Sequence, residues 1–179
     1  PELVWKAPIG TGYAGPAVSG GRVYVFDRAL ADVTDLPDNP FERGEIPGKE
    51  SLHCLESATG KVVWSKSYDT NYTVSYAAGP RCTPVIHEGL VYTLGAEGRL
   101  FVRRVGTGDV VWEKDFVSVL KTKTPTWGFA ATPLIEDDLL ICLAAGDGST
   151  VVAYDKKTGE ERWRALGAKE PGYCPPRLL

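Results

Sequence analysis

Short apolar runs separated by glycine-rich turns recur along the chain. Val23–Phe26, Leu90–Leu94 and Leu139–Leu143 are rich in branched and aromatic residues, and the first follows the turn Ser19–Gly21. This arrangement predicts β-strands joined by tight hairpins, and no long stretch shows the 3.6-residue period of an amphipathic helix. The pattern therefore predicts an all-β fold.

One phrase, T-G-x-x-x-W, occurs three times and defines a repeat. It covers Thr59–Trp64, Thr107–Trp112 and Thr158–Trp163, so the tryptophans are 48 and 51 residues apart. A four-stranded unit that recurs near this spacing, with short strands and glycine turns, is typical of a β-propeller blade. The sequence thus predicts a partial β-propeller built from antiparallel blades.

Glycine and tryptophan have different predicted roles in this phrase. The glycine lies in the turn between the third and fourth strands, where a positive φ is needed. The tryptophan is expected to pack between neighbouring blades, because a buried indole removes a large apolar area from water. The predicted structural docking residues are Gly60, Trp64, Gly108, Trp112, Gly159 and Trp163.

The segment Gly10–Gly15 matches the G-x-G-x-x-G fingerprint of dinucleotide-binding proteins. That fingerprint requires a helix directly after the glycines, whose backbone amides bind a pyrophosphate. Here Pro16–Val18 and a glycine turn follow, and the same place in the later repeats reads GPRCTP, GFAATP and GYCPP. The glycines are therefore interpreted as the entry to a strand.

The repeat predicts one partial propeller domain over residues 1–179, with about three complete blades and a half-blade at each end. The predicted units are residues 1–12 (last strand of a preceding blade), 13–68 (a blade with an insertion at 27–51), 80–116 and 129–166 (two further blades), and 172–179 (first strand of a next blade). Closed propellers need about four to eight blades, so the remaining blades of a longer parent protein are expected to complete the ring.

The third repeat, Ala153–Trp163, resembles the docking motif A-x-D-x-x-T-G-x-x-x-W of pyrroloquinoline-quinone-like (PQQ-like) propellers at every defined position. The first repeat departs from the motif at Cys54 and Glu56, and the second at Val102 and Arg104. This family includes eight-bladed quinoprotein dehydrogenases, the cofactor-free outer-membrane assembly lipoprotein, and extracytoplasmic sensor modules. The resemblance implies the fold and a periplasmic or otherwise extracytoplasmic location.

Two features of the dehydrogenases are missing from the sequence. Those enzymes carry two adjacent cysteines at the quinone, whereas Cys54, Cys82, Cys142 and Cys174 are solitary, and no G-T-G-N-P segment is present. No cofactor is therefore expected, and PQQ with calcium is expected only under the dehydrogenase alternative. The four cysteines are interpreted as small buried thiols.

Loop length predicts where a binding site lies. The long connections, at residues 27–51, 67–81 and 116–131, all join the second to the third strand of a blade or one blade to the next. Antiparallel strands place these connections on one side, here called the long-loop face. Its candidate binding residues are Tyr72, Tyr76, Trp127 and Phe129. The alternative is that these aromatic side chains pack small cores inside the loops.

Charge and the remaining candidate groups restrict the function further. The net charge of −3 argues against nucleic acid, which needs a basic patch, and no apolar run is long enough to span a membrane. The acidic insertion lacks the spacing of a calcium loop, and His53 and His87 are expected to lie apart, outside any catalytic triad. The chain contains no Met and is interpreted as a fragment.

The sequence as a whole favours a non-catalytic binding or scaffolding module that contacts a protein partner or a small ligand through the long-loop face. Two alternatives stay open: a fragment of a PQQ-dependent quinoprotein dehydrogenase, and an extracytoplasmic sensor domain of a signalling protein.

Overall fold

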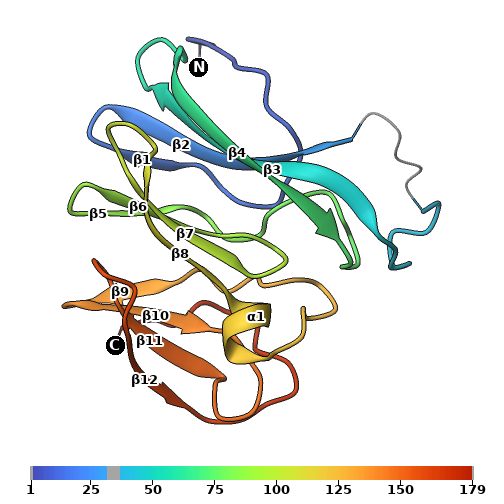
Figure 1. The fold of residues 1–179 in the computed structure, drawn as a ribbon. Helices are drawn as coiled ribbons and strands as arrows, with labels where there is room; N and C mark the ends of the chain where they lie inside the picture. Colours follow the sequence, from blue (N-terminus) through green and yellow to red (C-terminus); the bar gives the residue numbers. More distant parts are fainter. Residues whose placement is uncertain (1, 32–36, 179) are drawn as a thin grey trace.

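The structure is a computed structural model that describes residues 2–31 and 37–178, as three four-stranded sheets and one short helix (Figure 1). The strands are β1 (Ala17–Ser19), β2 (Arg22–Leu30), β3 (Ile46–Glu56), β4 (Val62–Tyr72), β5 (Val85–His87), β6 (Leu90–Leu94), β7 (Arg99–Arg104), β8 (Val110–Asp115), β9 (Leu134–Glu136), β10 (Leu139–Leu143), β11 (Val151–Asp155) and β12 (Glu161–Ala165); the helix is α1 (Phe116–Leu120).

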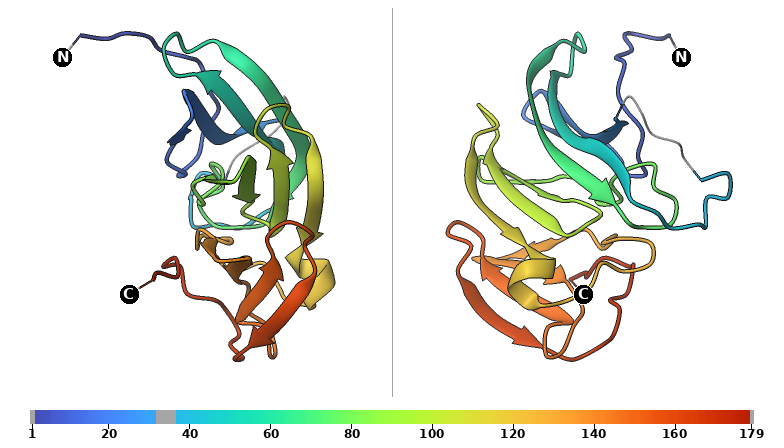
Figure 2. Two further views of the ribbon diagram at one scale, coloured as in Figure 1. Left: turned by 90° about the vertical axis from the view of Figure 1, so that its left-hand side faces the viewer. Right: turned by 45° about the vertical axis from the view of Figure 1, so that its right-hand side comes forward.

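Each sheet is an antiparallel meander in which consecutive strands pair. The first sheet runs β1-β2-β3-β4, the second β5-β6-β7-β8 and the third β9-β10-β11-β12. The sheets follow one another along an arc without closing into a ring, with the short strands β1, β5 and β9 on its inner side (Figure 2). This arrangement confirms the predicted partial propeller.

Two apolar layers hold the sheets together. Between the first and second sheets lie Tyr24, Phe26, Leu52, Cys54 and Val91, each at most 2% exposed. Between the second and third sheets a larger cluster includes Tyr92, Leu100, Val102, Trp112, Leu140, Cys142, Val152 and Tyr154. Alternate residues of each strand supply these layers, as the period of a β-strand requires.

The first sheet is longer than predicted. Residues 27–51 were expected to form an insertion, yet β2 continues to Leu30 and β3 begins at Ile46, and the two strands pair as far as Leu30 and Gly48. Arg28 and Glu50 point inward in this extension and are both 1% exposed. Because these inward positions are charged, the sequence lacks the alternation of apolar and polar residues that would have predicted the strands here. Residues 32–36 lie outside the described residues, and residues 37–45 are called the insertion loop below.

The two predicted terminal half-blades form no strand. In residues 2–12 there is only an isolated bridge between Thr11 and Arg28, and residues 172–178 contain no strand. Neither segment pairs as a strand with one of the three sheets. The assignment of both segments to neighbouring blades stays a prediction.

The helix α1 was not predicted. The carboxylate of Asp115 caps it by accepting hydrogen bonds from the backbone N–H groups of Val117 (3.1 Å) and Ser118 (3.4 Å). Lys121 ends it with a left-handed φ of 54°. A helix of five residues is too short to produce a hydrophobic period, so only its capping aspartate marks it in the sequence.

Candidate functional site

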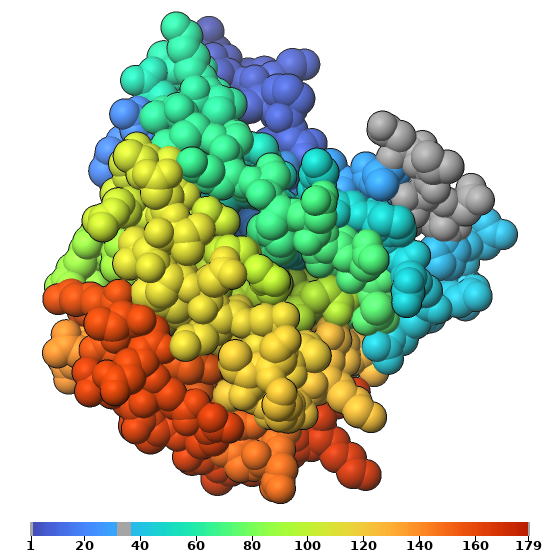
Figure 3. All heavy atoms as spheres, viewed as in Figure 1, coloured from blue at the N-terminus to red at the C-terminus, as the bar shows by residue number. Residues whose placement is uncertain are grey.

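The connections of the long-loop face form a continuous surface. The backbone N–H of Tyr76 in the β4–β5 loop donates to the carbonyl of Pro40 in the insertion loop (2.8 Å). The N–H of Ser75 donates to the carbonyl of Thr126 in the α1–β9 loop (2.9 Å). In Figure 3 the cyan atoms of the insertion loop lie against the green atoms of the β4–β5 loop. Three loops from different sheets thus support one another.

Tyr72, a predicted binding residue, is fully buried below this surface. Its hydroxyl and that of Tyr68 both donate to the carboxyl group of Glu50, which also accepts from the N–H of Ala96 (3.0 Å). Arg28 stacks on the Tyr72 ring at 3.9 Å. Burial raises the pKa of Glu50, against the opposite effect of its hydrogen bonds. Tyr72 therefore anchors the first sheet to the second and does not contact a ligand directly.

Phe129, also predicted for binding, is 1% exposed. Its ring packs edge-on against Phe116 at 5.6 Å, and its backbone N–H donates to the carbonyl of Ala96 (2.9 Å). For both Tyr72 and Phe129 the alternative expectation, that loop aromatics form internal cores, describes the structure. The rings of these two candidate binding residues are not exposed, because they cover the gaps between sheets.

Trp127 differs from them because its side chain is 49% exposed. It lies in a β-turn closed by the N–H of Gly128 and the carbonyl of Pro125 (2.9 Å). Gly128 has a φ of 74°, and a Cβ there would lie 2.9 Å from the carbonyl oxygen of Ala96. The indole packs against Tyr173 with ring centroids 5.4 Å apart. The sequence did not predict Tyr173 as its neighbour.

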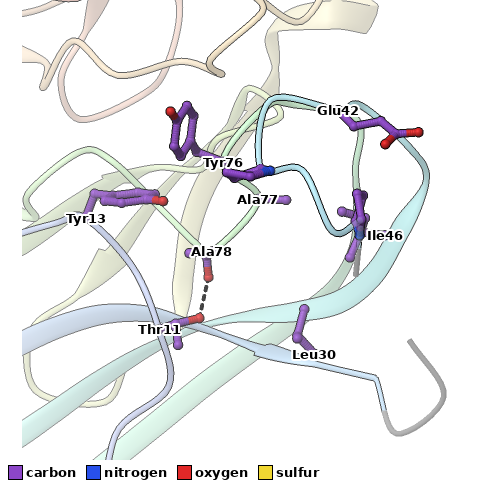
Figure 4. A pocket seen from close by; sticks show the side chains of 10 residues that line it. Thr11, Tyr13, Leu30, Glu42, Ile46, Tyr76, Ala77 and Ala78 are labelled. Carbon is purple, nitrogen blue, oxygen red and sulfur yellow. Dashed lines mark hydrogen bonds between the residues drawn. The ribbon is translucent and has the colours of Figure 1, made fainter. Parts of the chain in front are cut away.

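Tyr76 lines an apolar pocket of about 230 Å³ beside the insertion loop. Figure 4 shows the rings of Tyr76 and Tyr13 on one side of this pocket and Leu30 and Ile46 on the other. Tyr76 has a left-handed φ of 53°, and its ring meets Phe41 edge-on at 4.9 Å. A non-glycine residue in this conformation is unusual and indicates that the surrounding contacts hold the loop in place.

A wider groove of about 730 Å³ lies between the insertion loop and the α1–β9 loop. Its charged lining residues are Arg43, Lys121, Lys123, Lys169 and Glu170. The four cations form no ion pair within 4.0 Å in the described part of the chain. These residues come from three segments that are far apart in the sequence, so the sequence did not predict the groove.

The tryptophan contacts lie on the side opposite the long-loop face, at the tight turns between the third and fourth strands of each sheet, here called the short-turn side. The indole N–H of Trp64 donates to the carbonyl of Val105 (2.9 Å), and that of Trp112 to the carbonyl of Lys156 (3.2 Å). Each acceptor lies three residues before the turn glycine of the next sheet, Gly108 or Gly159. A Cβ on either glycine would come within 2.7 Å of the indole.

The first and last tryptophans extend this pattern differently. Trp5 donates from its indole N–H to the carbonyl of Ser57 (2.8 Å) and lies against Gly60. Trp163, which was expected to be buried, is 42% exposed. Trp5, Trp64 and Trp112 each contact the turn of the sheet that follows them, and Trp163 belongs to the third sheet.

His53 is part of a side-chain network that the sequence analysis missed. Its Nδ1 lies 2.7 Å from Ser65 Oγ and its Nε2 lies 3.1 Å from Asp27 Oδ1. Ser65 lies opposite His53 across the β3–β4 pair, so register brings the groups together. The network faces away from the second sheet and is partly covered by the N-terminal segment, whose Gly10 N–H donates to Asp27. These contacts favour a structural link that ties the N-terminal segment to the first sheet.

The remaining predicted groups stand apart. Cys54, Cys82 and Cys142 are buried, whereas Cys174 is exposed, which corrects the expectation for that residue. Within residues 2–31 and 37–178, no group of three or more His, Cys, Asp or Glu side chains is arranged to hold a metal ion. Calcium takes six to eight oxygen ligands, and no carboxylate cluster that would supply several of them lies among the described residues.

Comparison with known proteins places the fold. A family model described as outer membrane protein assembly factor BamB matches residues 48–173. No curated protein matches the sequence. Among solved structures, BamB from Moraxella catarrhalis is 16% identical with a TM-score of 0.58, and the match covers 90% of this chain and 43% of that protein.

Two further structures show the same fold. A europium-containing methanol dehydrogenase is 16% identical with a TM-score of 0.58, covering 90% of this chain and 26% of the enzyme. The computationally designed Ika4 protein is 14% identical with a TM-score of 0.58, covering 97% of this chain and 84% of Ika4. The chain thus spans less than half the length of the natural relatives. It belongs to the PQQ-like propeller family described as outer membrane protein assembly factor BamB.

Proposed function

We propose that this chain is a non-catalytic, protein-binding part of a PQQ-like propeller and that it contacts its partner through the long-loop face. The observation that carries the proposal is Trp127, a half-exposed indole on a turn that buried residues hold in place. Tryptophan is enriched among the residues that dominate binding energy at protein interfaces. An anchor that is ordered before binding also loses less conformational entropy on association.

The support beneath Trp127 is extensive. Phe129, two residues further along the chain, is buried between sheets, and the carbonyl of Thr126 accepts the N–H of Ser75 (2.9 Å). Tyr173 covers one side of the indole. Contacts of Thr126, Phe129 and Tyr173 therefore hold the turn in place. This support favours a role in partner binding, rather than a purely structural role, for the exposed face of the indole.

The dehydrogenase alternative is favoured by one observation, the fold shared with the methanol dehydrogenase. Under that reading the calcium and quinone ligands would come from other blades of a longer protein, because no group of three or more His, Cys, Asp or Glu side chains among the described residues is arranged to hold a metal ion. A dye-reduction assay of the full-length protein with added PQQ and Ca²⁺ separates the two readings. Quinone-dependent reduction would support the enzyme, and its absence with a folded protein would support the binding module.

An extracytoplasmic location is part of the proposal and is supported by the family's description as an outer membrane protein assembly factor. No helix among the described residues is long and apolar enough to cross a membrane.

Site-specific photo-crosslinking tests the binding face. A photoreactive phenylalanine analogue replaces Trp127 in one variant and Val110 in a control variant of similar exposure, 45%, on the short-turn side. The proposal predicts a discrete crosslinked protein from position 127 and none from position 110. Equal crosslinking from both positions, or crosslinking from position 110 alone, would contradict it.

A further inference from the structure

The groove beside Trp127 has a charge that differs from the rest of the protein. The chain carries 23 acidic and 20 basic residues, giving a net charge of −3. Yet Arg43, Lys121, Lys123 and Lys169 converge on one groove with a single carboxylate, Glu170, among its lining residues. All four cations are exposed, and none forms an ion pair in the described part of the chain.

The groove is shaped by ordered backbone. The guanidinium Nε of Arg43 donates to the carbonyl of Thr73 (2.6 Å), which joins the insertion loop to the β4–β5 loop. Thr122 is buried and donates from its hydroxyl to the carbonyl of Ala144 (3.3 Å), which fixes the segment that carries Lys121 and Lys123. Hydrogen bonds to the rest of the fold therefore hold the segments that carry Arg43, Lys121 and Lys123 in place.

Glu170 offsets only one of the four positive charges in the groove, and neutral hydroxyl groups hold its carboxylate in place. One oxygen accepts from the Thr126 hydroxyl (3.2 Å) and the other from the Tyr173 hydroxyl (3.4 Å). These contacts link the groove directly to the loop of Trp127 and to Tyr173, which packs on that indole. The basic groove and the exposed indole thus form one continuous surface.

We propose that this groove binds an acidic segment of the protein partner, an extended stretch of Asp and Glu residues. The inference rests on the proposed binding function and specifies its partner. The volume of the groove, about 730 Å³, lies within the range of ligand-binding clefts, about 300 to 1,000 Å³. Lysine ammonium groups act as point charges that accept carboxylates in many orientations, which suits a flexible acidic segment. Complementary charge also steers association and selects partners.

A peptide fits these observations better than a nucleic acid does. Binding of a polyphosphate backbone requires a basic stripe that neutralises many phosphates, and the protein outside the groove is net negative. A segment of a few carboxylates needs only the four cations present.

The test uses a fluorescently labelled decaglutamate peptide and measures fluorescence anisotropy with the full chain. The informative variant is K123E/K169E, which reverses two exposed charges and leaves Lys121 at the end of α1 in place. The matched control is K61E/R104E, which makes the same change in net charge at two exposed positions away from the groove. Circular dichroism confirms that each variant folds.

The inference predicts that K123E/K169E weakens peptide binding by roughly tenfold or more, since attraction becomes repulsion at two sites. At an ionic strength of about 0.1 M, K61E/R104E should change the affinity by less than about threefold, because exposed charges more than about 10 Å away are then screened. Equal weakening by both double variants, or no binding of the peptide to the unaltered chain at low salt, would overturn the inference. Tighter binding of a labelled deoxythymidine decamer in the same groove would also overturn it.

These results are separable from the proposed function. Crosslinking from position 127 that persists in K123E/K169E at full yield, together with no decaglutamate binding, would leave the binding face standing and remove the acidic partner. If position 127 gives no crosslinked protein while the unaltered chain still binds decaglutamate, the proposed role of the Trp127 turn is contradicted. The assignment of the groove as a site for acidic segments then stands.

Discussion

The contact between an indole and the turn glycine of the next sheet predicts a specific coupling between Gly159 and Trp112. Gly159 has a φ of 73°, and a Cβ added there would lie 2.7 Å from Trp112 Cδ2. Gly21 has nearly the same φ, 72°, and nothing lies within 4 Å of a Cβ placed there. Gly21→Ala therefore lowers the unfolding free energy only through the left-handed backbone conformation. Gly159→Ala must also displace the Trp112 indole, which is 9% exposed.

The magnitudes follow from these two costs. A left-handed alanine costs about 1–2 kcal/mol, so Gly21→Ala should lower the unfolding free energy by about that amount. Overpacking adds about 1–3 kcal/mol, so Gly159→Ala should cost about 2–5 kcal/mol in all. Trp112→Ala alone should cost about 3–5 kcal/mol. In the Trp112→Ala background the cost of Gly159→Ala should fall to that of Gly21→Ala.

Urea unfolding of the wild type, the three single variants and the Gly159→Ala/Trp112→Ala double variant measures this cycle. The reasoning predicts a coupling energy of about 1–3 kcal/mol between Gly159 and Trp112. Equal destabilisation by Gly159→Ala and Gly21→Ala, with a coupling energy under about 0.3 kcal/mol, would refute the contact.

Three further predictions concern titratable groups. Burial raises the pKa of Glu50, so the stability that its bound proton contributes is present at low pH and is lost as the pH rises through the folded pKa. Glu50→Gln should therefore flatten the decline in unfolding free energy that begins above the unfolded carboxyl pKa, and an unchanged decline would count against this role of Glu50. The Arg162 guanidinium and the backbone N–H groups of Thr158 and Lys157 lower the pKa of Asp155, so its contribution to folding stability is present above the unfolded pKa and is lost as the pH falls through the folded pKa. Asp155→Asn should lower the melting temperature at neutral pH and weaken the dependence of the melting temperature on acid. An identical acid profile in wild type and variant would argue otherwise. Burial raises the pKa of Cys82 to about 12, and Cys54 and Cys142 are also buried, so maleimide labelling of the native protein followed by peptide mass spectrometry should modify Cys174 alone; rapid labelling of any buried thiol would show that its sheet opens.

The sequence predicted the repeated parts of the fold well because one physical constraint acts at each repeat. The turns at Gly60, Gly108 and Gly159 all have a φ between 70° and 73°, which glycine adopts without strain, so the same residue recurs at the same register. A repeated constraint is visible in a single sequence. The boundaries were less predictable where charged residues face inward, as at Arg28 and Glu50.

The candidate site was harder to predict because it is assembled from parts that do not repeat. Aromatic enrichment pointed to the correct loops but did not distinguish the buried rings of Tyr72 and Phe129 from the exposed ring of Trp127. That difference depends on which ring closes the gap between two sheets, which is a tertiary property. The groove cations and the contact of His53 with Ser65 likewise depend on spatial register rather than on spacing along the chain.

Hydrogen–deuterium exchange of the full-length protein, with and without the partner captured from position 127, tests whether the long-loop face is the binding surface. We expect the partner to slow exchange in residues 40–45, 73–78 and 121–128 on this face. Exchange in the turns at residues 57–60, 105–108 and 156–159 should stay unchanged. Protection confined to those turns, with no change on the long-loop face, would contradict the account.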